Sequence, residues 1–231
     1  MTGRLRIVGV GPGDPGLLTL EARSVLAGAA NVAALHPEGT SATALRIARA
    51  HLPAHARIMT FGWPRGHNDQ ARARFYGEVE ERLAALLERG EDVVLPCLGD
   101  PLLYGSASRL AERLGRRFTV EITPGITSLQ AAASALNRPL ARGEEILAWV
   151  PATAAEARIE AALRFADVTV VLKLGRHLPR IRRLIARAGL ADRAWLAAEL
   201  GSARARLLPL ARVEEEPPYM SLLLVRRREA P

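Results

Sequence analysis

The sequence predicts an α/β protein in which strands and helices alternate along the chain. Short and nearly continuous apolar runs, bounded by glycine, proline or charge, are typical of buried strands. Segments with apolar residues at helical spacing lie between these runs. The chain has 231 residues, which is enough for one large domain or two small ones. We therefore expect a parallel sheet that is covered by helices on both faces.

In the first half of the chain, predicted strands and helices follow each other in turn. The strands are Leu5–Val10, Asn31–Leu35, Asp92–Leu95 and Thr119–Ile122. The helices are Leu17–Ala27, Ser41–Ile47, Gln70–Arg89 and a segment from Ser106 through Leu114. We expect Ser41 and Ser106 to cap their helices and Gly90 to end the longest one. Residues 57–69 are expected to be irregular, because glycine and proline recur there.

In the second half the strands change character, and we place a domain boundary near residue 122. The division gives an N-terminal α/β domain, residues 1–122, and a C-terminal α/β domain, residues 123–231. The strands expected after the boundary are Ile146–Val150, Val168–Lys173, Ala194–Glu199 and Ser221–Val225. Helices are expected near residues 129–136, 154–165 and 177–188. On the last helix, the arginines opposite the apolar side are expected to form a solvated face: Arg180, Arg183 and Arg187.

The charge of the chain does not by itself indicate a nucleic-acid partner. The formal net charge is +8, and Lys173 is the single lysine among 32 basic residues. Nucleic-acid binders usually add aromatic platforms or a dense basic stripe. Here aromatic residues make up 4% of the chain, and the arginines are scattered. We therefore expect no nucleic-acid partner, with an arginine-rich RNA-binding module as the alternative.

The sequence predicts a cytoplasmic protein without a membrane partner. Its apolar runs are far shorter than the ~20 residues that cross a bilayer. The amino terminus leads into a strand without the apolar core of a signal peptide. Cys97 is the single cysteine, which excludes an internal disulfide and suits a reducing compartment.

A loop rich in glycine and proline follows the first predicted strand: Gly9-Val10-Gly11-Pro12-Gly13-Asp14-Pro15-Gly16. Its glycines fit the dinucleotide fingerprint G-x-G-x-x-G, so an NAD-linked oxidoreductase is an alternative function. However, Asp14 would place a carboxylate where a pyrophosphate should bind. The second strand ends in His36 and not in an acid for the ribose. Pro12 and Pro15 also remove backbone donors, so the loop better suits a cationic or large flat ligand.

A second loop follows the third predicted strand: Cys97-Leu98-Gly99-Asp100-Pro101-Leu102-Leu103-Tyr104-Gly105-Ser106. A strand that ends in Gly-Asp-Pro ahead of a helix places a carboxylate and exposed backbone groups at the carboxyl edge of a sheet. Open α/β proteins bind their ligands at that edge. The alternative is a tight turn in which Asp100 only accepts a hydrogen bond from the nearby backbone.

Three motifs in this order and spacing resemble those of the tetrapyrrole methylases. They are Val8–Pro15 with Leu18-Thr19-Leu20, Gly99-Asp100-Pro101 with Tyr104-Gly105, and Pro124-Gly125-Ile126-Thr127-Ser128. The resemblance runs from Leu5 to about Val225. It implies a two-domain α/β fold, each domain a sheet flanked by helices, with the active-site cleft between the domains. It also implies S-adenosyl-L-methionine as methyl donor, a small-molecule tetrapyrrole substrate and a homodimer.

Within the family, the chain looks like the members that methylate carbon 20 of precorrin-2 or cobalt-precorrin-2 in cobalamin biosynthesis. The similarity lies in the form of the central loop, the long helix ahead of it, and Leu172–Arg176 with Pro179–Ile181. Members that methylate uroporphyrinogen carry an aspartate where this chain has His36. The carbon-20 members often carry an acid where this chain has Leu98. This departure keeps a different methylation site within the family as an alternative.

The resemblance also implies a set of cofactor-binding residues. They are Pro12, Gly99, Asp100, Leu103, Thr127 and Ser128, with Leu174 and Gly201 as contacts from the second domain. Ordinary core packing is the alternative for Leu103 and Leu174. We expect no metal site and assign no catalytic residue, because the donor is already activated and the enzyme mainly aligns it with the acceptor. Arginines at the cleft mouth are expected to pair with substrate carboxylates.

Overall fold

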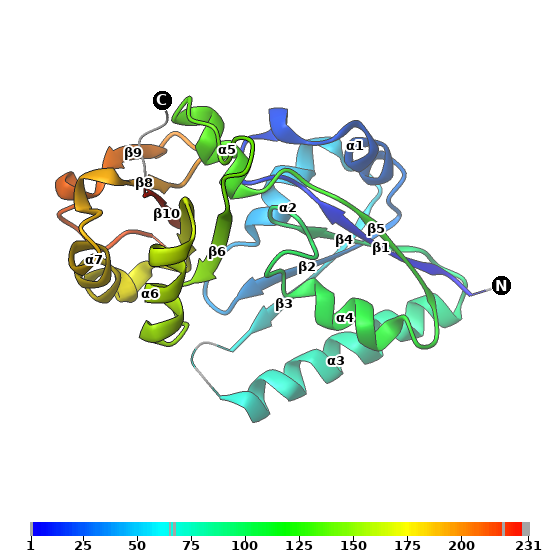
Figure 1. Cartoon of the computed structure of the whole chain (residues 1–231). Helices are drawn as coiled ribbons and strands as arrows, with labels where there is room; N and C mark the ends of the chain where they lie inside the picture. Colours follow the sequence, from blue (N-terminus) through cyan, green and yellow to red (C-terminus); the bar gives the residue numbers. More distant parts are fainter. Residues whose placement is uncertain (1, 65, 67, 219, 228–231) are drawn as a thin grey trace. The chain divides into compact units, whose positions relative to one another are not determined.

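The protein is described by a computed structural model that covers residues 2–64, 66, 68–218 and 220–227. The chain forms two compact units, Met1–Thr127 and Ser128–Pro231, and each contains a five-stranded sheet (Figure 1). The predicted α/β fold with one helix-flanked sheet in each unit is confirmed. The division falls after Thr127, whereas the sequence places a boundary near residue 122.

The sheet of the first unit is entirely parallel, as the alternating order predicts. Its strand order is β3-β2-β4-β1-β5. The strands are β1 (Arg4–Gly9), β2 (Asn31–Pro37), β3 (Arg57–Trp63), β4 (Val93–Cys97) and β5 (Thr119–Thr123). A parallel sheet needs crossover connections, and here helices supply them. They are α1 (Leu20–Ala27), α2 (Thr43–Ala48), α3 (Asp69–Glu88) and α4 (Ala107–Leu114), with short 3₁₀ turns at Pro15–Leu17 and Arg49–His51.

Helices cover both faces of this sheet, and β1 shows why. Successive side chains of a strand point to opposite faces. Leu5 and Ile7 therefore pack into one core with α3 and α4, and Val8 and Val10 pack into another with α1 and α2. All four side chains are at most 1% exposed. A continuous apolar run is thus what a central strand buried on both faces requires.

The prediction that residues 57–69 are irregular is wrong for Arg57–Trp63, which forms β3. This strand lies at the edge of the sheet, where it pairs with β2, and its side chains are half-buried or exposed. An edge position tolerates the glycine that weakens a strand in the interior. Residues 65 and 67 lie outside the described residues.

The long helix α3 begins and ends at local signals. The side chain of Asn68 accepts a hydrogen bond from the N–H of Ala71 (3.0 Å) and so caps the first turn. Gly90 follows the last turn with a φ of +79° and donates to the carbonyl of Leu87 (3.0 Å). The predicted helix over 70–89 and its glycine stop are confirmed, with bounds shifted by one residue.

The two predicted serine caps are not made. Ala42 occupies the cap position of α2 and Ser106 that of α4, and neither side chain makes a capping hydrogen bond. Ser106 has a helical backbone (φ −69°, ψ −21°), whereas a capping side chain acts from an extended one. Burial of Ala44 and Ile47, and of Leu110 in α4, stabilises these helices instead.

The sheet of the second unit is mixed, with strand order β6-β7-β10-β8-β9. Its strands are β6 (Leu147–Pro151), β7 (Val168–Leu172), β8 (Ala194–Ala198), β9 (Arg206–Pro209) and β10 (Ser221–Arg226). β6 and β7 are parallel, and β10 runs antiparallel to both β7 and β8. β7 and β8 therefore run in the same direction, and their carboxyl ends lie at one edge. The sequence did not predict β9, a short edge strand whose residues are mostly exposed.

Helices cover both faces of the second sheet as well. On one face, α6 (Glu156–Phe165) and α7 (Leu178–Arg187) pack against Leu223 and Val225 of β10. On the other, α5 (Ser128–Ala135) packs against Leu222 and Leu224. Short 3₁₀ turns follow at Gly175–His177, Ala191–Arg193 and Leu210–Arg212.

The predicted solvated face of α7 is confirmed for two of its three arginines. Arg183 and Arg187 are exposed. Arg180 is half-buried and donates to the carbonyls of Ala152 and Ala154, so it belongs to the packing of the unit. A guanidinium carries five donors in a fixed fork and satisfies carbonyls at loop ends well, which helical spacing alone does not reveal.

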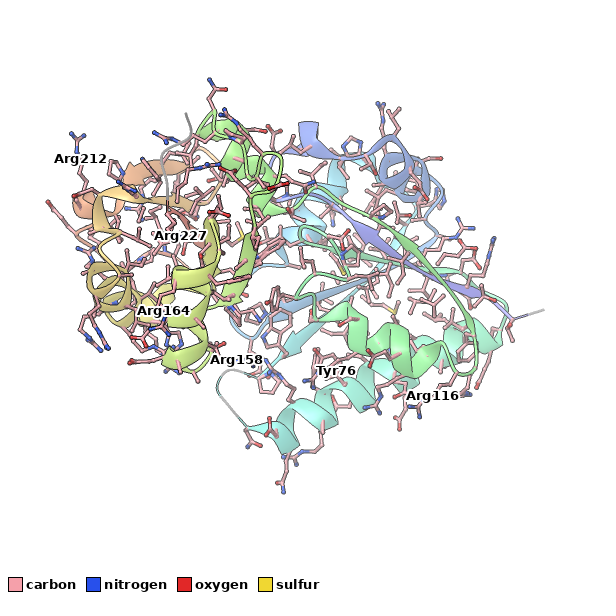
Figure 2. All side chains as sticks on the ribbon, in the orientation of Figure 1. Tyr76, Arg116, Arg158, Arg164, Arg212 and Arg227 are labelled. Carbon is pink, nitrogen blue, oxygen red and sulfur yellow. The ribbon has the colours of Figure 1, made fainter. Side chains whose placement is uncertain are left out.

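Exposed arginines occur on both units, as their scattered positions in the sequence suggest. Figure 2 labels Arg116 in the first unit and Arg158, Arg164 and Arg212 in the second, all of which are exposed. Among the described residues, no helix combines the length and the apolar character needed to cross a membrane.

Candidate functional site

The carboxyl ends of three neighbouring strands meet at one edge of the first sheet. β1 lies between β4 and β5, so that Gly9 is beside Cys97 and Val8 is beside Thr123. The helix that follows β1 packs on one face of the sheet, and the helix that follows β4 packs on the other. The carboxyl ends of β1 and β4 therefore form a topological switch point, where open α/β sheets bind ligands. All three motif-bearing loops begin at this edge.

Backbone hydrogen bonds hold the first two loops together. The N–H of Val10 donates to the carbonyl of Cys97 (2.8 Å), and the N–H of Gly99 donates to the carbonyl of Gly11 (2.8 Å). Gly11 and Gly99 have φ values of +74° and +69°, a conformation that glycine adopts without steric cost. The loops thereby extend the pairing of β1 with β4 beyond the ends of the strands.

The third loop packs against the other two through glycine. A Cβ atom on Gly125 would lie 2.1 Å from the carbonyl oxygen of Gly99, and one on Gly9 would lie 2.6 Å from the amide nitrogen of Gly125. Only glycine fits where backbones approach so closely. A Cβ on Gly99 itself would meet no atom within 4 Å, so its positive φ alone restricts that position.

Asp100 joins the second and third loops. Its Oδ1 accepts a hydrogen bond from the N–H of Leu102 (2.9 Å), which is the turn that the sequence offered as the alternative. Its Oδ2 accepts from the N–H of Gly125 (3.1 Å), 25 residues away. The carboxylate therefore does more than stabilise its own turn, because it also fixes the position of the third loop.

The first loop uses its polar groups to hold its own shape. Asp14 Oδ1 accepts from the N–H of Gly16 (2.8 Å), and Thr19 Oγ1 accepts from the N–H of Ala22 at the start of α1 (3.1 Å). Pro12 and Pro15 have no N–H to donate. A pyrophosphate needs several backbone donors at this place, so the loop does not fit a dinucleotide.

Three consecutive apolar side chains stand out from the second loop. Leu102, Leu103 and Tyr104 are 63%, 36% and 47% exposed, and Tyr104 has a φ of +55°. The turn is tight, since a Cβ on Gly105 would lie 2.3 Å from the carbonyl oxygen of Pro101. Core packing, the alternative for Leu103, is therefore not its role in this unit.

Two buried groups support the second loop from below. The hydroxyl of Tyr76 in α3 donates to the carbonyl of Ser106 (3.4 Å), and burial raises the pKa of this phenol. Burial, with a smaller contribution from Asp100, raises the pKa of the Cys97 thiol. The thiol is therefore neutral at physiological pH, and Cys97 is not a nucleophile.

The predicted cofactor-binding residues are divided between the two units. The first unit brings the loops of five of them to one edge of its sheet: Pro12, Gly99, Asp100, Leu103 and Thr127. Pro12 is buried, and Thr127 is half-buried. Ser128, an exposed residue, begins α5 in the second unit. The sequence did not identify Gly9 and Gly125 as site residues, although each lies in a motif, close to the end of a strand.

Leu174 and Gly201 lie at one edge of the second sheet, after β7 and β8. The side chain of Leu174 is fully buried in the core with α6 and α7, as the packing alternative predicts. Any contact of Leu174 with a ligand would therefore involve its backbone. Gly201 is exposed and has a φ of +78°.

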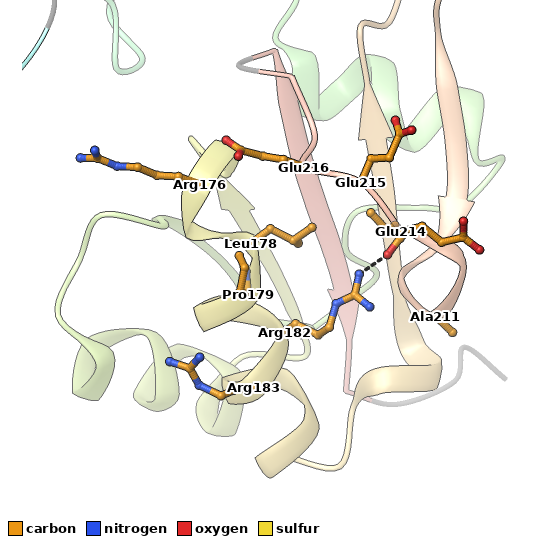
Figure 3. A pocket seen from close by; sticks show the side chains of 10 residues that line it. Arg176, Leu178, Pro179, Arg182, Arg183, Ala211, Glu214, Glu215 and Glu216 are labelled. Carbon is orange, nitrogen blue, oxygen red and sulfur yellow. Dashed lines mark hydrogen bonds between the residues drawn. The ribbon is translucent and has the colours of Figure 1, made fainter.

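A pocket of about 690 Å³ lies in the second unit, between α7 and residues 211–216 (Figure 3). Arg176, Arg182 and Arg183 line one side, and the glutamates Glu214–Glu216 line the other. Arg182 donates to the carbonyl of Val213. The positive charges of these arginines and the negative charges of the glutamates offset each other. None of the predicted cofactor residues lines the pocket. In the described part of the chain, no three His, Cys, Asp or Glu residues gather as a metal ion would require.

Comparison with known proteins bears directly on the three loops. The sequence model of the family described as Tetrapyrrole (Corrin/Porphyrin) Methylases matches residues 4–214, which include every motif above. The chain belongs to this family. The resemblance inferred from the motifs is thereby confirmed.

Curated members of the family are similar over most of this chain. Precorrin-2 C(20)-methyltransferase of Sinorhizobium sp is 36% identical, with 96% of this chain and 95% of that protein covered. Cobalt-precorrin-2 C(20)-methyltransferase of Salmonella typhimurium is 32% identical, with coverages of 99% and 98%. Cobalamin biosynthesis protein CobIJ of Mycobacterium tuberculosis is 38% identical over 96% of this chain but only 46% of its own length. The chain thus spans about half of that relative.

A solved structure has the same fold as the chain described here. Uroporphyrin-III C-methyl transferase from Thermus thermophilus, complexed with S-adenosyl homocysteine, superposes with a TM-score of 0.70. The two sequences are 23% identical, and 97% of each chain is covered. The likeness covers both units of this chain.

Proposed function

We propose that this chain is an S-adenosyl-L-methionine-dependent methyltransferase that methylates carbon 20 of precorrin-2, or of its cobalt-bound form, in cobalamin biosynthesis. The observation that carries the proposal is the nearly end-to-end match to two relatives that are named for this reaction. CobIJ is about twice as long as the matched region, and its name specifies no methylated carbon. CobIJ therefore supports a role in cobalamin biosynthesis, and the position of methylation is inferred from the other two relatives.

The loops of the first unit fit the proposed cofactor. The methyl group of S-adenosyl-L-methionine is carried by a cationic sulfonium, and the cofactor has no pyrophosphate. Pro12 and Pro15 have no N–H, and the N–H of Gly16 is already bonded to Asp14, so the loop suits such a ligand better than it suits NAD. We propose that the residues named above bind it: Pro12, Gly99, Asp100, Leu103, Thr127 and Ser128, with Leu174 and Gly201.

The chain's contribution to the reaction is alignment. When bound, the cofactor supplies a methyl group that is already activated for transfer. Asp100 holds two loops in register, and the glycine contacts at Gly9 and Gly125 bring the backbone of the third loop against them. Bringing donor and acceptor into the right geometry costs translational and rotational entropy, and this cost is a large part of the barrier in such reactions. A site that is already rigid adds little further entropy cost of its own. The exposed side chains of Leu102 and Tyr104 add apolar surface beside it.

Two finer features belong to this proposal. We propose a cytoplasmic enzyme, in keeping with the single cysteine Cys97, which is buried as a free thiol. We also propose a homodimer, as the resemblance to the family implies. The substrate is a small tetrapyrrole, whose carboxylates suit bidentate binding by arginine.

The test is methyl transfer from a carbon-13-labelled donor to precorrin-2 and to its cobalt form, with the product analysed by NMR. We expect one labelled methyl group on carbon 20. A label on a pyrrole-ring carbon would assign the chain to a different reaction of the family. Calorimetry separates the cofactor classes: we expect S-adenosylhomocysteine to bind at about −8 kcal/mol, a micromolar affinity, and NAD not to bind. The reverse pattern would overturn the proposal.

A further inference from the structure

A row of ion pairs joins α3 and α4, which pack into one core of the first unit (Figure 1). Arg113 of α4 pairs with Glu80 of α3, and Arg117, just past the end of α4, pairs with Glu88. The members of the row are separated by multiples of four residues, a spacing that keeps side chains on one face of a helix.

The row changes at its amino-terminal end. Four residues before Arg113 comes Arg109, and four residues before Glu80 comes Tyr76. The guanidinium of Arg109 lies over the ring of Tyr76, 5.7 Å from the ring centroid, which is within the range of a cation–π contact. Arg72 comes four residues earlier still on α3. Two arginines and a tyrosine therefore occupy this end, whereas the rest of the row pairs arginine with glutamate.

Arg72 and Arg109 are exposed, and in the described part of the chain neither has an ion pair with a carboxylate. The carboxylates three residues away on the same helices, Asp69 and Glu112, are not paired with them. A cation–π contact uses no acceptor atom, so the N–H donors of Arg109 remain available to a ligand. Other exposed arginines, such as Arg116, also have no carboxylate partner, so the position of this pair has to carry the argument.

That position is directly beneath the second loop. Tyr76 is buried, its ring packs edge-on against Phe75, and its hydroxyl donates to the carbonyl of Ser106, the last residue of the loop (Figure 2). Burial raises the pKa of the Tyr76 phenol, and the charges of Arg109 and Arg72 oppose that rise. Both arginines therefore lie close to the tyrosine that supports the loop.

The second loop and its support combine two chemical characters. The loop exposes three consecutive apolar side chains, Leu102–Tyr104, and the two arginines add positive charge close to where the loop ends. A tetrapyrrole has the matching characters, because it is a large apolar ring system with carboxylates at its rim. Arginine binds carboxylates bidentately, and its planar fork loses little freedom for each hydrogen bond that it forms.

We propose that Arg72 and Arg109 bind a carboxylate at the rim of the tetrapyrrole, an inference that rests on the proposed function. The substrate carboxylate takes the part that glutamate plays in the rest of the row. Tyr76 is a positioning residue, because it contacts the guanidinium of Arg109 and also supports the second loop. No bond is made or broken at this site, so the two arginines contribute to substrate binding and not to the chemical step.

The decisive variants are Arg72→Gln and Arg109→Gln, which remove the charge and keep a polar side chain. We expect each to raise the KM for the tetrapyrrole about tenfold or more, as loss of a hydrogen bond between charged groups does. The kcat should stay within about twofold of the parent, because the contact is equal in the ground state and the transition state. Arg109→Lys, which keeps the charge without the fork, should raise KM less than Arg109→Gln.

Arg116→Gln is the matched control for a lost charge in the same unit, because Arg116 is exposed and follows α4 (Figure 2). We expect it to leave KM unchanged. All of these variants should bind S-adenosylhomocysteine like the parent and unfold at the same urea concentration. The KM of the parent should also rise more steeply with salt than that of a variant with both Arg72→Gln and Arg109→Gln, because salt screens exposed charges.

Each outcome has a consequence. A parent protein that methylates no tetrapyrrole overturns the proposed function and this inference with it. A methylating parent whose two glutamine variants keep its KM overturns this inference alone. So does an equal rise of KM in Arg116→Gln, because overall charge would then explain the effect. A parallel loss of S-adenosylhomocysteine affinity also overturns it, since the arginines would then act through the cofactor loops.

Discussion

At the carboxyl edge of the first sheet, the backbones of three loops touch at Gly9, Gly99 and Gly125, and the carboxylate of Asp100 joins the second loop to the third. At the corresponding edge of the second sheet, charged side chains stand on corners of left-handed backbone, at Lys173 and Glu199. One edge is defined by close backbone contact and the other by the placement of charge.

The difference indicates that the two edges depend on different features of the chain. An activated donor needs a rigid surface of fixed shape more than it needs charge, and glycine contacts supply that surface. At the second edge, the left-handed backbone fixes the direction in which Lys173 and Glu199 leave their strands. Separate variants at the two edges should therefore affect different properties.

Gly125→Ala should have the largest effect, because its Cβ would lie 2.1 Å from the carbonyl oxygen of Gly99 and 2.8 Å from the Cα of Gly9. Both atoms belong to the backbone, so the clash cannot be relieved by rotation of a side chain. We expect a loss of about 3 kcal/mol or more in the free energy of unfolding, together with loss of S-adenosylhomocysteine binding. Urea denaturation and calorimetry measure the two effects.

The matched control is Gly77→Ala, in α3. A Cβ there meets no atom within 4 Å, so the substitution should gain about 0.5–1 kcal/mol from helix propensity. If Gly125→Ala were as stable as the parent, the first edge would not depend on backbone contact.

Much of the first edge could be predicted from the sequence, for a physical reason. Continuous apolar strands followed by glycine and proline report both a buried parallel sheet and the loops at its carboxyl edge. The pairing of Asp100 with Gly125 could not be predicted, because it joins residues 25 positions apart and depends on strand order. β3 and β9 were missed since edge strands lack the apolar pattern of buried ones.

The second edge was harder to predict. The strands β7, β8 and β10 have apolar sequences and were predicted near their observed positions. The left-handed backbone of Lys173 has no sequence signal, because lysine is not a residue that favours it. The burial of Leu174 depends on two helices that pack on the sheet: α6, which precedes Leu174 in the sequence, and α7, which follows it.

Asp100→Ala should weaken the binding of S-adenosylhomocysteine by roughly 1–3 kcal/mol, since two backbone donors lose their acceptor. Asp14→Ala is the matched control. Asp14 also accepts from a backbone N–H two residues on, but it bridges no second loop. We expect a smaller loss there, and calorimetry compares the two. Equal effects would mean that the bond to Gly125 contributes nothing to binding.

Lys173→Asn and Lys173→Ala should differ slightly in stability, and their comparison isolates backbone strain. Both variants remove the amine, but asparagine tolerates a φ of +59° better than alanine does. We expect the asparagine variant to be more stable by about 1 kcal/mol or less, measured by urea denaturation. Identical stabilities would mean that the corner is not strained, and that the second edge is less distinct from the first than we infer.

The smallest expected effect is a pH dependence that belongs to the second unit alone. The carboxylate of Glu145 accepts from the buried Arg226 of β10 (2.9 Å), and this hydrogen bond lowers the pKa of Glu145, with desolvation and, less strongly, Asp167 opposing the shift. A lowered pKa in the folded state means that the folded protein holds its proton less tightly than the unfolded chain. The stabilisation is therefore present at neutral pH and is lost as the pH falls below about 4.5, through the folded-state pKa.

Glu145→Gln keeps the shape of the side chain and removes its titration. We expect the melting temperature of the parent to fall more steeply than that of this variant between about pH 5 and pH 3, the range in which a carboxyl of lowered pKa titrates. Other carboxyl groups contribute equally to both proteins, so the difference between the two curves reports Glu145. Parallel curves would show that its pairing with Arg226 adds no acid sensitivity. The acid sensitivity of the second unit would then come from titratable groups other than the Glu145–Arg226 pair, which joins β10 to the segment ahead of β6.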